Sequence, residues 1–148
     1  MKSFLWFLLS AFLLISSGAA EASRHSSFGG GHHFSFKKQK SYQVYQKTHR
    51  HTGQVYIGRT SGRGTPDENI RVRDRNHHRN KDGFGQAKLL HTSANKHAIR
   101  GQEQRLIAKH RAAGTGADQI NGVGPYNPRK NQYSRAAEKE FPGKSKIE

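Results

Sequence analysis

Residues 42–60 hold two short β-type segments separated by a polar turn, and this pattern constrains the fold more than any other stretch. β-branched and aromatic residues favour a pleated, half-buried surface. The residues between the segments, 47–54, are polar apart from Gly53, and Thr52 with Gly53 predicts the turn. A hairpin of this kind brings two tyrosines onto neighbouring strands. The β-forming residues are Val44 and Tyr45 in the first segment, and Val55, Tyr56 and Ile57 in the second.

A helix is predicted directly after the hairpin, at residues 66–79. Thr65 suits the N-cap, Pro66 suits the first turn, and Glu68 can reach back to complete a capping box. The short mixed segment 85–91 then predicts a third strand.

A second and a third helix are predicted in the remainder of the chain. The second covers residues 94–113, with Ser93 as its cap and Gly114 in the left-handed position that ends it. The third covers 133–141. The sequence therefore predicts an α+β domain over residues 41–141, in which helices flank a small three-stranded antiparallel sheet.

The amino terminus has the order of a secretory signal peptide over residues 1–22: Lys2, an apolar run at 4–15, then small residues. The alternative is a membrane anchor, but a span needs about 20 apolar residues and this run is shorter. A secreted protein is therefore expected. Residues 23–40, rich in Gly, His and Ser, predict a flexible leader whose histidines could bind a metal loosely, and residues 142–148 predict a polar tail.

The chain carries a formal net charge of +16 over 148 residues and contains no cysteine. Removing the signal peptide would take away one base, Lys2, and one acid, Glu21, so the charge would not change. Such an excess predicts a polyanionic partner, either nucleic acid or an anionic membrane surface. No long amphipathic helix favours the membrane, so nucleic acid is preferred. A third interpretation is that the positive charge forms a solvated basic surface that binds no partner. Without cysteine, neither disulfides nor a thiolate nucleophile can operate.

Glu103 is the most informative single residue of the second predicted helix. It lies four residues from both Ile99 and Ile107, on the apolar face of that helix. Burying a carboxylate is costly unless it is paired or binds a metal. A structural ion pair with Arg100 or Arg73 is one explanation, and a carboxylate that faces a metal is the preferred one.

A set of residues in this order resembles the GIY-YIG nuclease superfamily, and in particular the GIY-YIG-type domains of bacterial polymorphic toxins. In that family a first tyrosine and a Tyr-Ile-Gly tripeptide lie on adjacent strands. An arginine and a histidine follow on a helix, then a glutamate on a later helix, and then an asparagine. Here Val44 precedes the first tyrosine where the family has Gly-Ile, whereas the tripeptide is complete. The matching positions are Tyr45, Tyr56-Ile57-Gly58, Arg73, His77, Glu103, and Asn127 or Asn121.

The resemblance implies hydrolysis of phosphodiester bonds with a divalent cation, Mg²⁺ first, held by Glu103. Arg73, a permanently charged fork, suits the charge of the transition state. An unperturbed phenol has a pKa near 10, whereas imidazole titrates near neutral pH, so the general base is assigned jointly to Tyr45 and His77. Tyr56 is expected to orient water or phosphate.

The expected substrate is nucleic acid, with DNA ahead of RNA, cut with little sequence preference because four arginines hold only the backbone. The resemblance also raises a small acidic immunity protein as a partner, and no membrane is expected to bind the mature form. Two rivals remain. Residues 76–80 superficially resemble an HNH-type metal site, and a cationic protein could bind nucleic acid or surfaces without catalysis. The four expected backbone-binding residues are Arg59, Arg63, Arg71 and Arg75.

Overall fold

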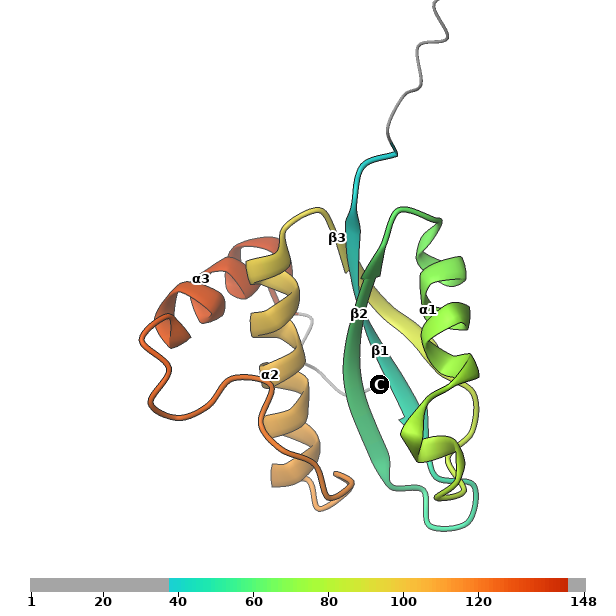
Figure 1. Ribbon diagram of the computed structural model, residues 1–148. Helices are drawn as coiled ribbons and strands as arrows, with labels where there is room; N and C mark the ends of the chain where they lie inside the picture. The colour runs from blue at the N-terminus through green and yellow to red at the C-terminus, as the bar shows by residue number, and fades with distance from the viewer. Residues whose placement is uncertain (1–37, 144–148) are drawn as a thin grey trace, which may run out of the picture. The chain divides into compact units, whose positions relative to one another are not determined.

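The computed structural model describes residues 38–143 of the chain. The predicted signal peptide, nearly all of the predicted leader and most of the predicted tail lie outside the described residues. The predicted class is confirmed, because the described chain is α+β with a three-stranded antiparallel sheet and three α-helices (Figure 1). In chain order the elements are β1 (Ser41–Thr48), β2 (Val55–Gly62), α1 (Pro66–Arg75), η1 (His78–Asn80), β3 (Lys88–Ser93), α2 (Lys96–Ala112) and α3 (Lys130–Glu140).

The sheet has the order β2-β1-β3, so the first strand is central and the hairpin partner β2 is an edge strand. Tyr45 lies opposite Gly58 in the β1–β2 register, and Lys47 lies opposite Tyr56. Gly53 turns the hairpin with a φ of +71°, a conformation that suits glycine, which confirms the predicted turn. The predicted third strand exists but starts three residues late and ends at Ser93.

The two faces of the sheet are covered by different helices (Figure 1). On the α2 face, apolar strand residues pack against apolar helix residues and form the core, and burial of each large aliphatic side chain contributes about 1.5–3 kcal/mol. On the α1 face the buried strand residues are polar, and this polar face positions the site. The α2-face core contains Val44, Val55, Ile57, Ala98, Ile99, Leu106, Ile107 and Phe141. The α1 face of β1 carries Gln43, Tyr45 and Lys47, all with no exposed surface.

The free edge of β2 is covered only along part of its length. The side chain of Gln119 accepts a hydrogen bond from the Ile57 amide and donates one to the Ile57 carbonyl, both at 2.9 Å. Val55 forms a backbone bridge with Gly116, in which the Val55 amide donates to the Thr115 carbonyl and the Val55 carbonyl accepts the Ala117 amide, both at 2.8 Å. Beyond Ile57 the edge borders the cavities described below, so side chains from both faces of the sheet can meet there.

The first helix is shorter than predicted. Its capping box forms as expected between Thr65 and Glu68, but the helix ends at Arg75 instead of 79. His77 is extended and caps η1, because its ring Nδ1 accepts the Arg79 amide. The prediction that His77 lies on the helix one turn after Arg73 was therefore wrong.

The ends of the other two helices also differ from those predicted. The N-cap of α2 is Asn95, whose side chain accepts the amides of the first turn, and not Ser93, which ends β3. The expected left-handed glycine after α2 is confirmed at Gly114, with a φ of +68°. The third helix begins three residues early, because Asn127 and Pro128 form a turn that leads directly into it. No helix within residues 38–143 combines the length and apolar character required to cross a membrane.

Candidate active site

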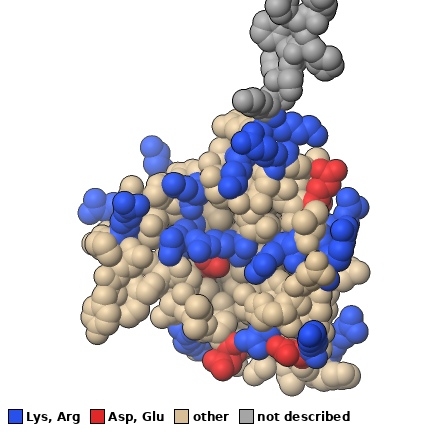
Figure 2. Space-filling model, in the orientation of Figure 1, with Lys and Arg blue, Asp and Glu red and all other residues tan. Residues whose placement is uncertain are grey.

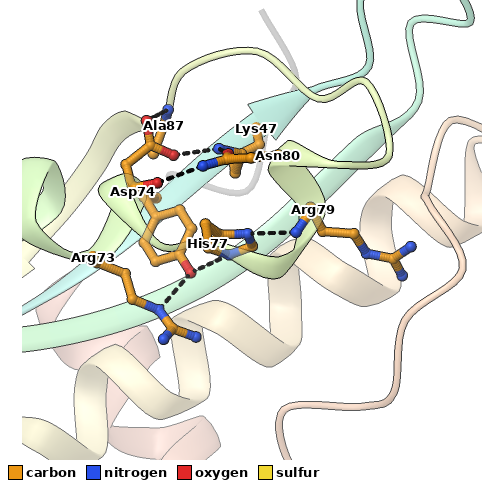
Figure 3. A network of polar contacts seen from close by, with 8 residues as sticks. Lys47, Arg73, Asp74, His77, Arg79, Asn80 and Ala87 are labelled. Carbon is orange, nitrogen blue, oxygen red and sulfur yellow. Dashed lines mark hydrogen bonds and ion pairs between the residues drawn. The ribbon is translucent and has the colours of Figure 1, made fainter.

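Tyr45, Arg73 and His77 meet on the α1 face of the sheet, although they come from a strand, a helix and a turn. The Tyr45 hydroxyl lies 2.9 Å from His77 Nε2 and 3.3 Å from Arg73 Nε. Figure 3 shows the arginine and the imidazole reaching this group from the ribbon of α1 and from the turn that follows it. The predicted convergence of these three side chains is present in the structure.

The hydrogen bond at Nδ1 of His77 determines the direction of the hydrogen bond at Nε2. Because the Arg79 amide donates to Nδ1 at 3.1 Å, Nδ1 carries a lone pair and the neutral ring carries its proton on Nε2. Nε2–H therefore donates to Tyr45. Arg73 Nε–H also donates to Tyr45, so the phenolic oxygen accepts two hydrogen bonds, an arrangement that stabilises a phenolate.

The imidazole of His77 also contacts the second tyrosine of the hairpin. Its ring centroid lies 5.7 Å from that of Tyr45 and 5.2 Å from that of Tyr56, in edge-to-face arrangements. The two phenols thus share one site through the histidine between them. Gly58 makes room for this arrangement, because a Cβ there would lie 2.5 Å from the Tyr45 hydroxyl oxygen.

Burial sets the charge states of these groups. It raises the pKa of Tyr45 to about 12, an effect that the Arg73 hydrogen bond partly opposes, and it also raises the pKa of Tyr56. Burial together with the positive charges of Lys47 and Arg73 lowers the pKa of His77 to about 4. At neutral pH both phenols are protonated and the imidazole is neutral.

A buried lysine supports this cluster and was missed in the sequence, where residue 47 was assigned to the turn. The Lys47 side chain has no exposed surface, and its ammonium binds the carboxylate of Asp74 and lies 2.6 Å from Asn80 Oδ1 (Figure 3). Asp74 in turn accepts the Ala87 amide, and Asn80 donates to the Asp74 carbonyl at 2.7 Å. These bonds fix the turn that carries His77. The sequence feature that could have indicated the burial of Lys47 is the period-2 alternation of a strand, which places it on the same face as Tyr45.

Glu103 projects from α2 toward the other side of β2. Its carboxylate is nearly buried, and its Oε2 lies 3.3 Å from Arg59 Nε. The expected structural partners were Arg100 or Arg73, and the observed ion pair uses Arg59 instead. Burial raises the pKa of Glu103, while Arg59 and Arg100 oppose the shift. Within the described chain, Oε2 accepts no hydrogen bond, so this buried oxygen has capacity for a further ligand.

A cavity of about 670 Å³ connects Glu103 with the tyrosine side of the site. Tyr56 borders it, together with Arg79, whose guanidinium lies 5.7 Å from the centre of the Tyr56 ring. Asn121 also borders this cavity, whereas Asn127 does not and instead accepts the Arg129 amide before α3. Of the two candidate asparagines, Asn121 is therefore the one that borders the Glu103 cavity, and its Oδ1 accepts a hydrogen bond from the Arg111 guanidinium at 2.7 Å.

The four arginines predicted to hold the substrate do not lie together. Arg59 borders both this cavity and a neighbouring one. Arg63 is exposed and hydrogen-bonds to the Lys38 carbonyl, and Arg71 borders a separate cavity next to α1. Arg75 is exposed at the end of α1. Four further cations line the site region that were not predicted as substrate-binding residues. They are Lys96, Arg79, Arg100 and Arg129.

The residues around Glu103 fit a loosely bound hard cation. No group of three or more His, Asp and Glu side chains converges as a metal site within residues 38–143. Mg²⁺ is commonly held by one or two carboxylates, with water and substrate phosphates completing its coordination. A single buried carboxylate with an unsatisfied oxygen beside a cavity is compatible with that mode. Asn121 borders the same cavity, but its Oδ1 already accepts the Arg111 guanidinium.

The chain matches no protein-family model, and neither the curated proteins nor the solved structures contain a match.

Proposed function

We propose that this chain is a metal-dependent endonuclease of the GIY-YIG type, exported by its amino-terminal segment, that hydrolyses DNA or RNA with little sequence preference. The observation that carries the proposal is the double hydrogen bond from Arg73 and His77 to Tyr45, at the opposite side of β2 from a nearly buried Glu103. A phenol that accepts two hydrogen bonds, a guanidinium that donates one of them and a nearly buried carboxylate on the other side of β2 suit phosphodiester hydrolysis.

In this mechanism Tyr45 is the general base. Arg73 Nε–H and His77 Nε2–H both donate to the Tyr45 oxygen, so the proton that is lost when Tyr45 ionises is its own hydroxyl proton. As phenolate it takes a proton from the attacking water. Neutral His77 is a donor at Nε2 and serves to hold the phenolate, a narrower role than the shared base expected from the sequence. A phenol with a pKa of about 12 is rarely ionised at pH 7, so nearby positive charge must assist.

Arg73 holds a non-bridging oxygen of the phosphate while it also contacts Tyr45, which aligns water and phosphate. Tyr56 borders the cavity and is available to hydrogen-bond the phosphate or the water. Glu103 would hold Mg²⁺, and Asn121 borders the same cavity. The bound ion would supply Lewis-acid polarisation of the phosphate and neutralise charge on the leaving oxygen.

The alternative is a cationic protein that binds nucleic acid without cutting it. It is favoured by the small number of metal ligands around Glu103 and by the band of Lys and Arg side chains that crosses the face of the molecule in Figure 2. Under this alternative the buried tyrosine cluster would be structural only.

One experiment separates the two functions. The purified protein is incubated with plasmid DNA and with RNA, in Mg²⁺ and in EDTA, and products are resolved on gels. Cutting that requires metal, is lost in Glu103→Ala and Arg73→Ala, and survives in Glu138→Gln supports the nuclease. Glu138 is an exposed carboxylate on α3 and serves as the charge-matched control. Binding without cutting in any divalent cation would leave the non-catalytic alternative.

A further inference from the structure

A second cavity, of about 550 Å³, lies next to the candidate active site and has a strongly basic lining. It is formed between the far end of β2, the first turn of α2 and the start of α3. Its lining contains five Lys and Arg side chains and no Asp or Glu. Like charges gathered around one hollow repel each other, and an anion placed between them relieves that repulsion. The five bases are Arg59, Arg73, Lys96, Arg100 and Arg129.

One of these bases is held in place but lacks a full set of partners. The Arg100 guanidinium lies 5.0 Å from the centre of the Tyr133 ring, a cation–π contact that fixes its plane. Its Nε is buried and donates no hydrogen bond within residues 38–143. The buried Nδ1 of His97 in the same lining is also without a partner there. Buried donors and acceptors of this kind are normally satisfied, so a polar ligand is expected here.

The start of α3 gives an independent indication of an anion. The first two helices have side-chain caps, from Thr65 and Asn95, whereas α3 begins at Arg129 without any side-chain cap. Asn127 accepts the Arg129 and Lys130 amides, and the following amides of the first turn, together with the helix dipole, favour an anion. Arg129, at the start of this helix, borders the cavity.

The basic cavity adjoins the cavity that contains Glu103. Arg59 and Arg100 line both, and Arg73, which contacts Tyr45, lines the basic one. Figure 2 shows the blue side chains continuing across this face from α2 over β2 to α1. A chain of phosphates that crosses the boundary between the cavities would therefore place one phosphate at Arg73 and the next ones among Lys96, Arg100 and Arg129.

We propose that the basic cavity binds backbone phosphates of the nucleic-acid strand on one side of the bond to be cut. This inference rests on the proposed function for the position of that bond. The substrate is then an internal segment of a strand, with phosphates beyond the reacting one. Nucleotides and strand ends that lack phosphates on this side bind poorly. Contacts limited to phosphate explain how such a site holds a strand without reading its sequence.

The test uses the full chain in EDTA, where no cutting occurs, with a short fluorescent single-stranded oligodeoxynucleotide as probe. Lys96→Gln with Arg129→Gln removes two cavity bases that are both exposed, so the fold is retained. Lys109→Gln with Lys139→Gln is the matched control. It removes the same charge from the same two helices, at ends that do not border the cavity. Fluorescence anisotropy is measured over a range of salt concentrations.

We expect the cavity variant to weaken binding about tenfold or more and to flatten the slope of log affinity against log salt by about 0.7 for each lost phosphate contact. The control is expected to stay close to wild type. Equal weakening in the two double variants would overturn the inference, because only net charge would then matter. Since the assay measures binding alone, a protein that never cuts nucleic acid could still show the expected difference between the cavity variant and the control. Conversely, a nuclease whose cavity variant binds as the control does would retain the proposed function and lose this inference.

Discussion

The two sides of β2 handle buried polar groups in opposite ways. On the α1 side, Tyr45, His77 and Lys47 are buried and each has partners within the protein. On the α2 side, Glu103 Oε2 and Arg100 Nε are buried and have no hydrogen bond within the described chain. Unsatisfied buried groups cost free energy, so their concentration next to two cavities points to a ligand. The buried groups of the α1 side are thus satisfied within the protein apart from Arg79 Nε, which borders the Glu103 cavity, whereas those of the α2 side have capacity for a ligand.

This contrast leads to different consequences of mutation. Removing a group from the α1 side leaves its partner unpaired and lowers stability. Removing a group from the α2 side takes away a poorly satisfied charge and lowers function while stability is kept.

The largest effect is expected for Lys47→Met. The substitution keeps most of the apolar stem but leaves the Asp74 carboxylate without its ammonium, and breaking a buried pair in this way costs about 3–5 kcal/mol. Because Asp74 is partly exposed, the low end of that range applies. Urea denaturation measures the loss, and Lys109→Gln is the control. A change within the error of the control would mean that this network does not hold the turn.

Glu103→Gln is expected to reduce cutting without lowering stability, the opposite of the effect on the α1 side. Replacing a carboxylate whose pKa burial has raised should leave the free energy of unfolding unchanged or higher. Cutting should fall by at least about 10²–10³-fold, the cost typical of losing one electrostatic stabiliser of a transition state. Melting curves and plasmid cleavage are compared in the same preparation. If stability fell with activity, the two sides of β2 would not differ as described.

The rate of cutting should rise with pH, by about tenfold per unit from neutral pH upward, because the phenolate fraction of Tyr45 grows by that factor below its pKa. The measurement is kcat/KM between neutral and moderately alkaline pH, in wild type and in Tyr45→Phe. A flat profile in wild type would exclude the phenolate as base.

Gly58→Ala should disturb the α1 side through crowding. The added Cβ would lie 2.5 Å from the Tyr45 hydroxyl, and Tyr45 is fully buried, so the ring cannot move without disturbing Arg73 and His77. Overpacking of this kind costs about 1–3 kcal/mol. Thermal unfolding gives the magnitude, with Gly124→Ala as control because nothing lies near the position of its added Cβ. Equal unfolding temperatures in the two variants would contradict the close approach.

The last effect concerns stability in mild acid. The folded state holds the pKa of His77 at about 4, below its usual 6.5, so an unfolded chain binds this proton first as the pH falls. The contribution of His77 to stability is present above about pH 6.5 and is lost progressively down to about pH 4. His77→Gln should therefore show a weaker decline than wild type over this window in urea denaturation. If the stabilities of wild type and His77→Gln fell in parallel as the pH is lowered, the imidazole of His77 would not be held neutral by the fold.

The sequence predicted the fold class and the order of elements well, because hairpin patterning and the capping box of Thr65 and Glu68 are local signals. It failed where side chains from distant segments decide the backbone. The helix that was expected to reach 79 ends at Arg75, since Lys47 on β1 binds both Asp74 and Asn80 and fixes the turn between them.

The candidate site shows the same limit. Tyr45, Arg73 and His77 do meet as predicted, but His77 arrives by a turn and not by helical spacing. Most of the predicted substrate arginines lie outside the cavities. The basic cavity needs Arg129 from the start of α3 beside Arg59 from β2, and no sequence period relates two residues so far apart.

The partly covered edge of β2 has a consequence for solubility. An open strand edge can pair with a second molecule and begin aggregation. Gln119 occupies the edge at Ile57, and the part that stays open begins at Arg59, in a protein of net charge +16. Two such edges would have to approach against strong mutual repulsion. The same positive charges that attract a polyanion therefore keep copies of this protein from joining edge to edge.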